Sequence, residues 1–594
     1  MHPRRTRRAI PFIVTLIAAA MSMLPGAQTH LPALHLNTTE VTCICPVVDT
    51  VWVGTSGGCL LWPADGNGVP THISTENELL PSNAVANICP GPMPGTVAVA
   101  TRRGLCILAE EGDGWTPVAG ASLPGRATAL CVGDDDILAA VEGQLYSGAA
   151  DTTPWHWAAL GPPLPTPARC LYRNDDGLLV GTAAGLYRLE GDTWEKLIHS
   201  EAPLAAMVND ITSLGETLYV ATAGGLFRFG EGAWACLGAA EGLPDAHVTA
   251  LTVRGEDLYI GTFGGGMAVL HKGRITQVHG SPGYITSLGA TEKAVWAGTP
   301  ESGVGAWNGA TWLQLTRPGE PPGNNITGVA AGAGGDVWIG TFDRGVGRLR
   351  EGMGWSSMPT GDLWINHLCF GRGRPWARTS GGDLLVPGKD HWRKLTRQDG
   401  LLKDWTSSVQ TSGGNVWVGT WGAVSKFDGK RWHHFAPKPA LEGQVVTCVA
   451  TMGPDIWVGT AKGGLCRYVG RSGIWETYSL GNGITDTWVT CLDVWDGRLW
   501  VGTFSGGLCS WDGTNWRSVR APSPLPSDRI NCIAHDLNLY VGTLDGLLIY
   551  DGKDWTPIAR ELLPHETVQS LCVNGSRLWV GTPEGLAWLC LPPD

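Results

Sequence analysis

The chain repeats one alternation of apolar and polar positions about fourteen times. An apolar run of the type LWVGT ends in Gly-Thr, is followed by a glycine turn, and leads into a second apolar run. Successive copies start 37 to 46 residues apart. A fixed period of this length is typical of folds built from stacked supersecondary units. The clearest copies are VWVGTSGG at 51–58, LYIGTFGGG at 258–266, VWVGT at 416–420, LWVGTFSGG at 499–507 and LWVGT at 578–582.

Each repeat contains four short runs that have the pattern of β-strands. In residues 242–278 these are VTALTV, LYIGT, GMAVL and RITQV, separated by the turn sequences RGED, GG and HKG. Alternating or β-branched runs bounded by glycine predict strands joined by tight turns. Four antiparallel strands in about 40 residues make one propeller blade.

The fourth run of many repeats begins with Asp-Gly or Asn-Gly, and a tryptophan follows a few residues later. We expect the Asp-Gly pair to form a two-residue hairpin turn. We expect the tryptophan to pack between neighbouring blades, where large aromatic side chains fill the wedge. Examples are Asn308-Gly309 with Trp312, Asp428-Gly429 with Trp432, Asp512-Gly513 with Trp516, and Asp551-Gly552 with Trp555.

Fourteen blades are too many for one ring, because propellers usually close with 4–8 blades. The sequence therefore predicts an all-β protein of two seven-bladed β-propellers in tandem, at residues 41–318 and 319–594. The division falls in the Pro/Gly-rich stretch RPGEPPGNN. The last repeat lacks a fourth strand. We expect residues 29–40 to be a linker, in which the alternating segment 30–37 supplies that strand and closes the second ring.

The combination of LWVGT..GGL with DG..W resembles the two-component regulator propeller repeat. That family occurs in periplasmic sensor regions of bacterial hybrid histidine kinases, commonly as two seven-bladed propellers followed by a β-sandwich, a membrane span and a kinase. The resemblance covers residues from about 40 to the C-terminus. It implies a periplasmic sensor-type double propeller. Since the sequence ends directly after the third strand of the fourteenth repeat, we expect a sensing component without the kinase region.

The N-terminal residues have the pattern of an export signal. Four arginines precede an apolar run at residues 9–24, which predicts a signal peptide or N-terminal anchor over residues 1–28. We therefore expect an exported protein, periplasmic or extracellular, with residues 9–24 as the alternative membrane anchor. The formal net charge is −12, and beyond the N-terminus there is no basic patch. Nucleic acid is not an expected partner.

Sixteen cysteines would suggest disulfides in an exported protein. Nine of them fall on predicted first strands and four on predicted third strands. Within one blade these two strands lie about 9–10 Å apart, too far for a disulfide, whose Cα atoms lie within about 7 Å. We expect most of them to be small core residues.

Candidate binding residues gather at one face of the second propeller. The loop before each first strand and the turn after each Gly-Thr share that face, and loops held by a rigid ring are where binding sites usually lie. Flat aromatic faces flanked by polar groups favour a carbohydrate, protein or peptide ligand; the alternative is packing between neighbouring loops. The candidates are Phe342, Asp343, Arg344, Trp421 and Phe504 after Gly-Thr pairs, and Trp364, Trp405, Trp488 and Arg529 before first strands.

Acidic residues recur at the same face, at positions 245, 404, 486, 528 and 566. Paired carboxylates could serve glycoside chemistry. Because these residues occupy matching turn positions in different repeats, hydrogen bonding to the following backbone is the simpler interpretation. No catalytic residue, metal ligand or cofactor motif is predicted.

The leading hypothesis is an exported, non-enzymatic double propeller that binds a ligand or a protein. It would be the sensing component of a signalling system and would have a separate membrane signalling protein as a partner. Two alternatives stay open. One is a polysaccharide hydrolase or lyase with carboxylates in the propeller funnel, and the other is a structural cell-surface scaffold.

Overall fold

The computed structural model describes residues 33–591, except 67–68, 113, 134–135, 150–154, 175–176, 198–206, 316–318, 351–352, 359, 361–363, 389–390 and 522–523. The signal or anchor predicted at residues 1–28 lies outside this range. Within it, no helix has the length and apolar character that a membrane span requires.

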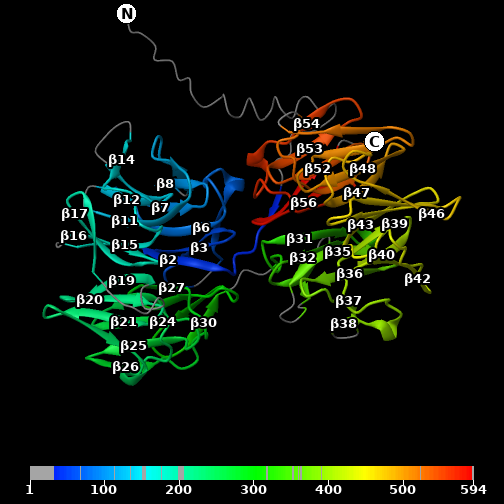
Figure 1. The fold of residues 1–594 in the computed structure, drawn as a ribbon. Helices are drawn as coiled ribbons and strands as arrows, with labels where there is room; N and C mark the ends of the chain where they lie inside the picture. Colours follow the sequence, from blue (N-terminus) through cyan, green and yellow to red (C-terminus); the bar gives the residue numbers. More distant parts are fainter. Residues whose placement is uncertain are drawn as a thin grey trace, which may run out of the picture. The chain divides into compact units, whose positions relative to one another are not determined.

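Fourteen antiparallel sheets make up the described chain, and the predicted all-β fold of two seven-bladed propellers is confirmed (Figure 1). Thirteen sheets have four strands, and the sheet of β6–β10 has five. The only helical segments are five 3-10 turns, at Thr75–Asn77, Ala239–Glu241, Ala333–Gly335, Arg397–Asp399 and Arg560–Leu562, among the residues that the structure describes. The chain divides into two compact units, Asn37–Pro318 and Gly319–Asp594, and the second includes the N-terminal residues up to Leu36.

The first propeller consists of seven blades in chain order. Its strands are β2 (Val41–Val47), β3 (Thr50–Thr55), β4 (Gly58–Pro63) and β5 (Thr71–Ile73); β6 (Val85–Pro90), β7 (Thr96–Thr101), β8 (Gly104–Glu111), β9 (Gly114–Pro117) and β10 (Leu123–Pro124); β11 (Ala127–Val132), β12 (Asp136–Val141), β13 (Gln144–Ala149) and β14 (Trp157–Leu160); β15 (Ala168–Asn174), β16 (Gly177–Thr182), β17 (Gly185–Glu190) and β18 (Thr193–Lys196); β19 (Val208–Leu214), β20 (Thr217–Thr222), β21 (Gly225–Gly230) and β22 (Ala233–Leu237); β23 (Val248–Arg254), β24 (Asp257–Thr262), β25 (Met267–His271) and β26 (Arg274–Gln277); β27 (Ser287–Ala290), β28 (Val295–Gly298), β29 (Val304–Trp307) and β30 (Trp312–Leu315).

The second propeller also has seven blades, and its last blade takes one strand from the N-terminus. Its strands are β31 (Ile326–Ala331), β32 (Val337–Thr341), β33 (Gly345–Arg350) and β34 (Gly354–Met358); β35 (Ile365–Gly371), β36 (Arg374–Thr379), β37 (Leu384–Pro387) and β38 (Trp392–Leu395); β39 (Ser408–Ser412), β40 (Asn415–Thr420), β41 (Ala423–Phe427) and β42 (Trp432–Phe435); β43 (Val446–Met452), β44 (Asp455–Thr460), β45 (Leu465–Val469) and β46 (Ile474–Tyr478); β47 (Val489–Trp495), β48 (Arg498–Thr503), β49 (Leu508–Trp511) and β50 (Trp516–Val519); β51 (Ile530–His535), β52 (Leu539–Thr543), β53 (Gly546–Tyr550) and β54 (Trp555–Pro557); β55 (Ser570–Asn574), β56 (Arg577–Thr582), β57 (Gly585–Cys590) and β1 (Ala33–His35).

Each ring closes by contact between its first and last blades. In the first propeller β2 contacts β27 and β28, and the Val41 amide donates to the Thr299 carbonyl oxygen at 2.9 Å. In the second propeller β31 contacts β55 and β56, and the Asn574 side-chain amide donates to the Gly335 carbonyl at 3.0 Å. First strands of successive blades contact one another all round each ring, so they are the innermost strands.

The N-terminal strand β1 completes the last blade of the second propeller. Leu34 lies opposite Ala587, and His35 lies opposite Leu586 of β57. The His35 ring stacks on Trp579 at 5.5 Å and accepts a hydrogen bond from Trp355 Nε1 at 3.2 Å. Because Trp355 belongs to the first blade of the ring and Trp579 to the last, β1 bridges the point at which the ring closes.

The tryptophans after the Asp-Gly turns pack between blades, as predicted. Three of them meet the edge of a second-strand tryptophan from the preceding blade in a T-shaped contact, an arrangement that aromatic rings favour. The pairs are Trp376 with Trp432, Trp457 with Trp516 and Trp500 with Trp555, at centroid distances of 6.2, 6.4 and 6.3 Å.

The predicted two-residue hairpin turns are wrong, because the turns are four residues long. Trp511 lies opposite Trp516, so the loop runs from Asp512 to Asn515. The Asp512 carboxylate accepts the backbone N–H groups of Asn515 at 2.8 Å and Thr514 at 3.0 Å. These bonds lower the pKa of Asp512 to about 2. The aspartate therefore stabilises the loop through its side chain rather than through a left-handed backbone of its own.

All sixteen cysteines are free thiols, and ten of them are buried. Burial raises the pKa of Cys448 and of Cys106 to about 12. The buried cysteines act as small apolar core residues, as their strand positions predicted.

Candidate ligand-binding rim of the second propeller

A ring of side chains surrounds one end of the second propeller, and we call it the rim. It consists of two positions in each blade, namely the end of the loop before the first strand and the turn after the Gly-Thr pair. In most blades a backbone hydrogen bond joins the two positions. Phe504 N donates to Trp488 O at 3.0 Å, and Ser380 N donates to Trp364 O at 2.8 Å. Residues that are distant in sequence are thereby brought together at the mouth of one ring.

The threonine of each Gly-Thr pair fixes the turn that carries a rim residue. Thr503 is fully buried; its hydroxyl donates to Gly507 O at 2.7 Å and accepts from Gly506 N at 3.0 Å. The same pair of bonds recurs at Thr460 with Gly464 and Gly463. A buried hydroxyl satisfied on both sides holds the following side chain in a defined place.

Five rim aromatics have large exposed fractions. These are Phe342 at 38%, Trp364 at 49%, Trp405 at 42%, Trp421 at 55% and Trp488 at 41%. Asp343 and Arg529 are also exposed, whereas Phe504 and Arg344 are half-buried. All nine residues that the sequence singled out thus lie in the rim turns and lead-in loops, and seven of them face solvent.

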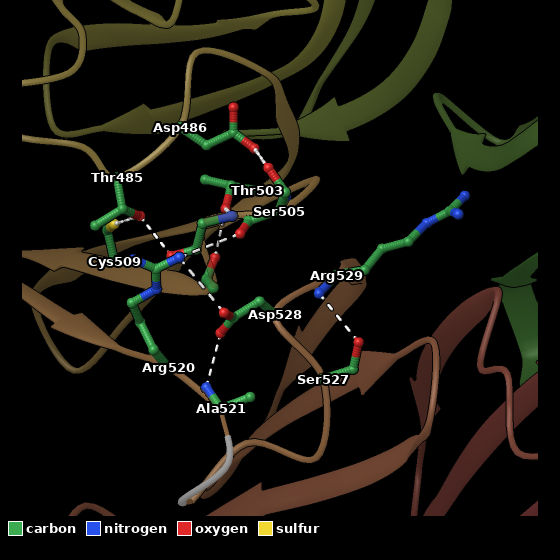
Figure 2. Close-up of polar contacts among 12 residues, drawn as sticks. Thr485, Asp486, Thr503, Ser505, Cys509, Arg520, Ala521, Ser527, Asp528 and Arg529 are labelled. Carbon is green, nitrogen blue, oxygen red and sulfur yellow. Dashed lines mark hydrogen bonds and ion pairs between the residues drawn. The ribbon is translucent and has the colours of Figure 1, made fainter.

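These residues form two separate stacked pairs of aromatic rings. Phe342 and Trp364, from adjacent blades, have centroids 4.9 Å apart and an interplanar angle of 28°. Trp488 and Phe504 are 4.4 Å apart at 12°. The Arg529 guanidinium lies 4.6 Å from the centroid of Phe504, a distance typical of a cation–π contact. Figure 2 shows the Arg529 side chain extending away from Asp528 and Arg520.

In the blade β39–β42 the two rim tryptophans make other contacts than the stacked pairs do. Ser407 N donates to Gly419 O at 2.7 Å, and Trp421 forms a backbone bridge with Val445 of the next blade. The indole of Trp405 instead lies against Gly382 of the preceding blade, where an added Cβ would be 2.3 Å from its Cδ1 atom. The structure therefore does not stack these two tryptophans on each other.

The acidic residues of the rim loops are engaged in local hydrogen bonds. The Asp486 carboxylate accepts from Trp488 N at 3.0 Å, Ser505 N at 2.7 Å and Ser505 Oγ at 2.8 Å (Figure 2). Burial opposes ionisation of Asp486, but these bonds outweigh it and lower its pKa. Asp528 accepts from Ala521 N at 2.7 Å and lies 3.4 Å from Arg520. The turn interpretation of these carboxylates accounts for their positions.

Side-chain hydrogen bonds that the repeat pattern did not predict join neighbouring blades in both propellers. In several blades of both propellers a Thr or Asn at or near the start of the innermost strand donates through its side chain to a carbonyl at or just before the start of the next blade's innermost strand. The recurrence of small hydroxyl residues at this position was the available signal. The bonds are Thr42 to Val85, Asn209 to Val248, Thr249 to Ile285, Thr286 to Val41, Thr327 to Ile365, Thr447 to Val489, Thr490 to Ile530 and Asn531 to Val568.

Within the part of the chain that the structure describes, no group of three or more His, Cys, Asp or Glu side chains is placed to hold a metal ion.

Comparison with known proteins identifies the fold. A family model described as Beta-prop_HVO_0234-like, beta propeller, matches residues 83–255. No curated protein matches the sequence. Among solved structures, the chain is similar to PorZ, a surface component of the type-IX secretion system of Porphyromonas gingivalis. The TM-score is 0.71 at 15% identity, and the match covers 94% of this chain and 87% of PorZ.

Two further structures are similar over most of the chain. The Niastella koreensis GH74 enzyme superposes with a TM-score of 0.63 at 13% identity, over 95% of this chain and 99% of the enzyme. The extracellular domain of the hybrid two component system BT3049 from B. thetaiotaomicron has a TM-score of 0.41 at 16% identity, over 95% of this chain and 83% of that domain. At these identities a likeness indicates the fold and not the activity, and a superposition as weak as the last does not bear on either.

Proposed function

We propose that this chain is an exported, non-enzymatic binding protein that recognises a carbohydrate, peptide or protein through the rim of its second propeller. The observation that carries the proposal is the exposure of five large aromatic side chains at equivalent loop positions of one ring. Large exposed aromatic groups on a rigid framework are unusual on a surface with no partner. Rings with polar neighbours suit ligands that have both apolar faces and hydrogen-bonding groups.

A sensing role follows from the resemblance of the repeats to sensor propellers, and its partner would be a separate membrane signalling protein. Export is supported by the arginine-rich, apolar N-terminal pattern. The likeness to PorZ, described as a bacterial surface component, agrees with a place outside the cytoplasm.

Polysaccharide cleavage, by hydrolysis or by the elimination that a lyase catalyses, is the weaker candidate function. A general acid needs a raised pKa at neutral pH, whereas the hydrogen bonds to Asp486 lower the pKa of that carboxyl. Asp528 accepts a hydrogen bond from Ala521 N and forms an ion pair with Arg520. Side chains held in turns in this way favour binding over catalysis.

The proposal is tested by probing a glycan array and a peptide array with the full chain and with the double variant Trp405→Ala/Trp421→Ala. We expect the variant to lose binding while its circular dichroism and melting temperature stay unchanged. Phe229→Ala is the matched control, because Phe229 is an exposed aromatic at 37% that lies in the first propeller. If the double variant keeps the wild-type binding pattern, the rim is not the ligand-binding site.

A further inference from the structure

Each stacked aromatic of the rim has at least one ring face covered by a neighbouring side chain. The rings of Trp488 and Phe504 are 4.4 Å apart and nearly parallel, so each covers one face of the other. Arg529 lies 4.6 Å from the same Phe504 ring, and one face cannot hold both neighbours at these distances. Phe504 is therefore covered on both faces. Phe342 and Trp364 cover each other in the same way at 4.9 Å.

The first propeller contains the same arrangement. Phe263 follows a Gly-Thr pair and lies 5.1 Å from His247 at an interplanar angle of 9°, and 4.4 Å from Tyr284. Its exposed fraction of 49% is larger than that of most rim aromatics, although its faces are occupied. A large exposed fraction alone therefore does not identify a ring whose face is free to bind.

Trp405 and Trp421 differ from the stacked residues. Among the described residues neither indole has another ring stacked on it, and Trp421 is the most exposed aromatic of the rim at 55%. The backbone explains this difference, because Trp421 is bridged to Val445 of the next blade while Trp405 lies on Gly382 of the preceding one. Neighbouring blades thus hold the two indoles apart and leave ring surface uncovered.

Polar groups of this blade and of the preceding one adjoin the two indoles. The Lys403 ammonium donates to the carbonyl oxygen of Trp421, and an ammonium has three N–H donors, so this bond uses one of them. The Arg378 guanidinium lies 6.0 Å from the Trp405 ring and donates through Nε to Thr406 O at 3.1 Å. Apolar ring faces and cationic hydrogen-bond donors therefore occur together where the blades β35–β38 and β39–β42 meet.

The backbone around these indoles is already paired. Gly422 N donates to Gln444 O at 2.7 Å, and Ala461 N donates to Val445 O at 3.0 Å. A peptide that binds as an added strand needs free backbone groups at an edge, and these positions do not provide them. Recognition is left to ring faces and side-chain donors, which is the combination that a pyranose sugar uses through its apolar C–H face and its hydroxyl groups.

We infer that Trp405, Trp421 and Lys403 form a sugar-binding surface in the blade β39–β42. In this surface the indoles stack on pyranose rings and the ammonium donates to a ring hydroxyl. The stacked pairs Phe342–Trp364 and Trp488–Phe504 then shape the rim without contacting the sugar. This inference rests on the proposed function and narrows its ligand to an oligosaccharide of pyranose units.

The test uses the full chain and a panel of cello-, xylo-, manno- and maltohexaose, with affinities measured by titration calorimetry. For the hexasaccharide that binds, Trp405→Ala and Trp421→Ala should each weaken binding about tenfold or more. Phe504→Ala and Phe263→Ala should change the affinity less than about threefold. Lys403→Met should weaken binding and Lys403→Arg should largely restore it, a pattern that loss of folding would not give. Melting temperatures of all variants establish that they are folded.

The two proposals fail in different ways. Binding of no hexasaccharide, or an equal loss of affinity in Phe504→Ala and Trp421→Ala, would overturn the sugar-binding surface. If the array then detects a peptide ligand that Trp405→Ala/Trp421→Ala loses, the proposed binding function still stands. If no ligand on either array depends on the rim, both proposals are wrong.

Discussion

The thiol of Cys448 packs directly against Gly459, its cross-strand partner. The two residues lie opposite each other on β43 and β44. A Cβ atom added to Gly459 would be 2.4 Å from the Cys448 sulfur and 2.6 Å from Cγ1 of Val489 in the next blade. The same pairing recurs at Cys43 with Gly54, Cys170 with Gly181, Cys491 with Gly502 and Cys532 with Gly542. The glycine of the repeat is therefore required where innermost strands of adjacent blades converge.

Gly459→Ala should destabilise the second propeller by about 1–3 kcal/mol, because inserting a methyl group into a packed core forces side chains and backbone to shift. The melting temperature, followed by circular dichroism, should fall. Cys448→Ala introduced together with Gly459→Ala should recover part of the loss, since the smaller side chain relieves the contact with sulfur but not the contact with Val489.

Gly114→Ala provides the control for this substitution. Apart from the glycine's chain neighbours, no atom of the described residues lies within 4 Å of a Cβ at Gly114, so the stability of the protein should change by less than about 0.5 kcal/mol. Equal effects at Gly114 and Gly459 would show that close packing is not the reason for the glycine in the repeat.

A chain that begins at Asn37, and so lacks β1, should lose stability in the second propeller alone. β57 would lose its pairing with Leu34 and His35, and Trp355 would lose its hydrogen-bond acceptor. Hydrogen–deuterium exchange resolved to peptides should rise in β55–β57 and β31 and stay unchanged in β2 and β27. A synthetic peptide of residues 30–37 should restore protection, and unchanged exchange in β57 would contradict the role of β1.

Stability of the first propeller should fall as the pH rises from about 4 to about 6. Burial raises the pKa of Asp210 from 3.8 to about 6, although backbone N–H bonds from Leu251 and Ile211 act in the opposite direction. Because the folded state binds the proton more tightly than the unfolded state, the stabilisation is complete below 3.8 and lost by about 6. Asp210→Asn should remove this dependence, worth no more than about 3 kcal/mol. A pH profile identical to that of the wild-type protein would contradict it.

Stability of the second propeller should change in the opposite direction over the same range. Burial, and then the charge of Arg577, lowers the pKa of His35 to about 4; burial and then Arg378 do the same for His367. These histidines stabilise the fold fully above 6.5 and lose that contribution as the pH falls toward 4. Urea midpoints measured from pH 7 to pH 4.5 should decline less in His35→Gln/His367→Gln than in the wild-type protein.

Thiol labelling should separate the cysteines into two groups. Cys236 and Cys590 are exposed and should react with a maleimide in the native protein. Buried thiols such as Cys448, whose pKa burial raises to about 12, should react only after unfolding because the thiolate is the reactive form. Mass spectrometry after denaturation without reductant should find all sixteen labelled. Persistent unlabelled pairs would indicate disulfides.

The architecture was predictable because the local sequence of each blade specifies its strands and turns. The alternation in VTALTV and LYIGT sets two strands, and the glycines after Thr262 set the turn between them. The Asp-Gly turns were harder. Asp512 caps a four-residue loop through its carboxylate, and a two-residue turn with the same Asp-Gly sequence differs only in how far the strands extend. Strand length depends on pairing across the blade, which the local sequence does not specify.

The candidate site was only partly predictable. The repeat period placed Trp405, Trp421 and Trp488 on one rim, because equivalent loops of one ring must meet. The period does not reveal that Trp488 is covered by Phe504 while Trp421 is not. A backbone bond joins Phe504 to Trp488, whereas in the blade β39–β42 Trp421 pairs with Val445 of the next blade.

Strand β1 precedes every other described strand along the chain, yet its partner β57 follows all of them. The entire first propeller and six blades of the second are therefore synthesised before β1 can pair with β57. Closure of the second ring therefore joins the two ends of the described chain, so a nascent chain interrupted before the blade β55–β57 would display an open ring and a free strand. Quality control that detects either feature would distinguish finished from unfinished copies.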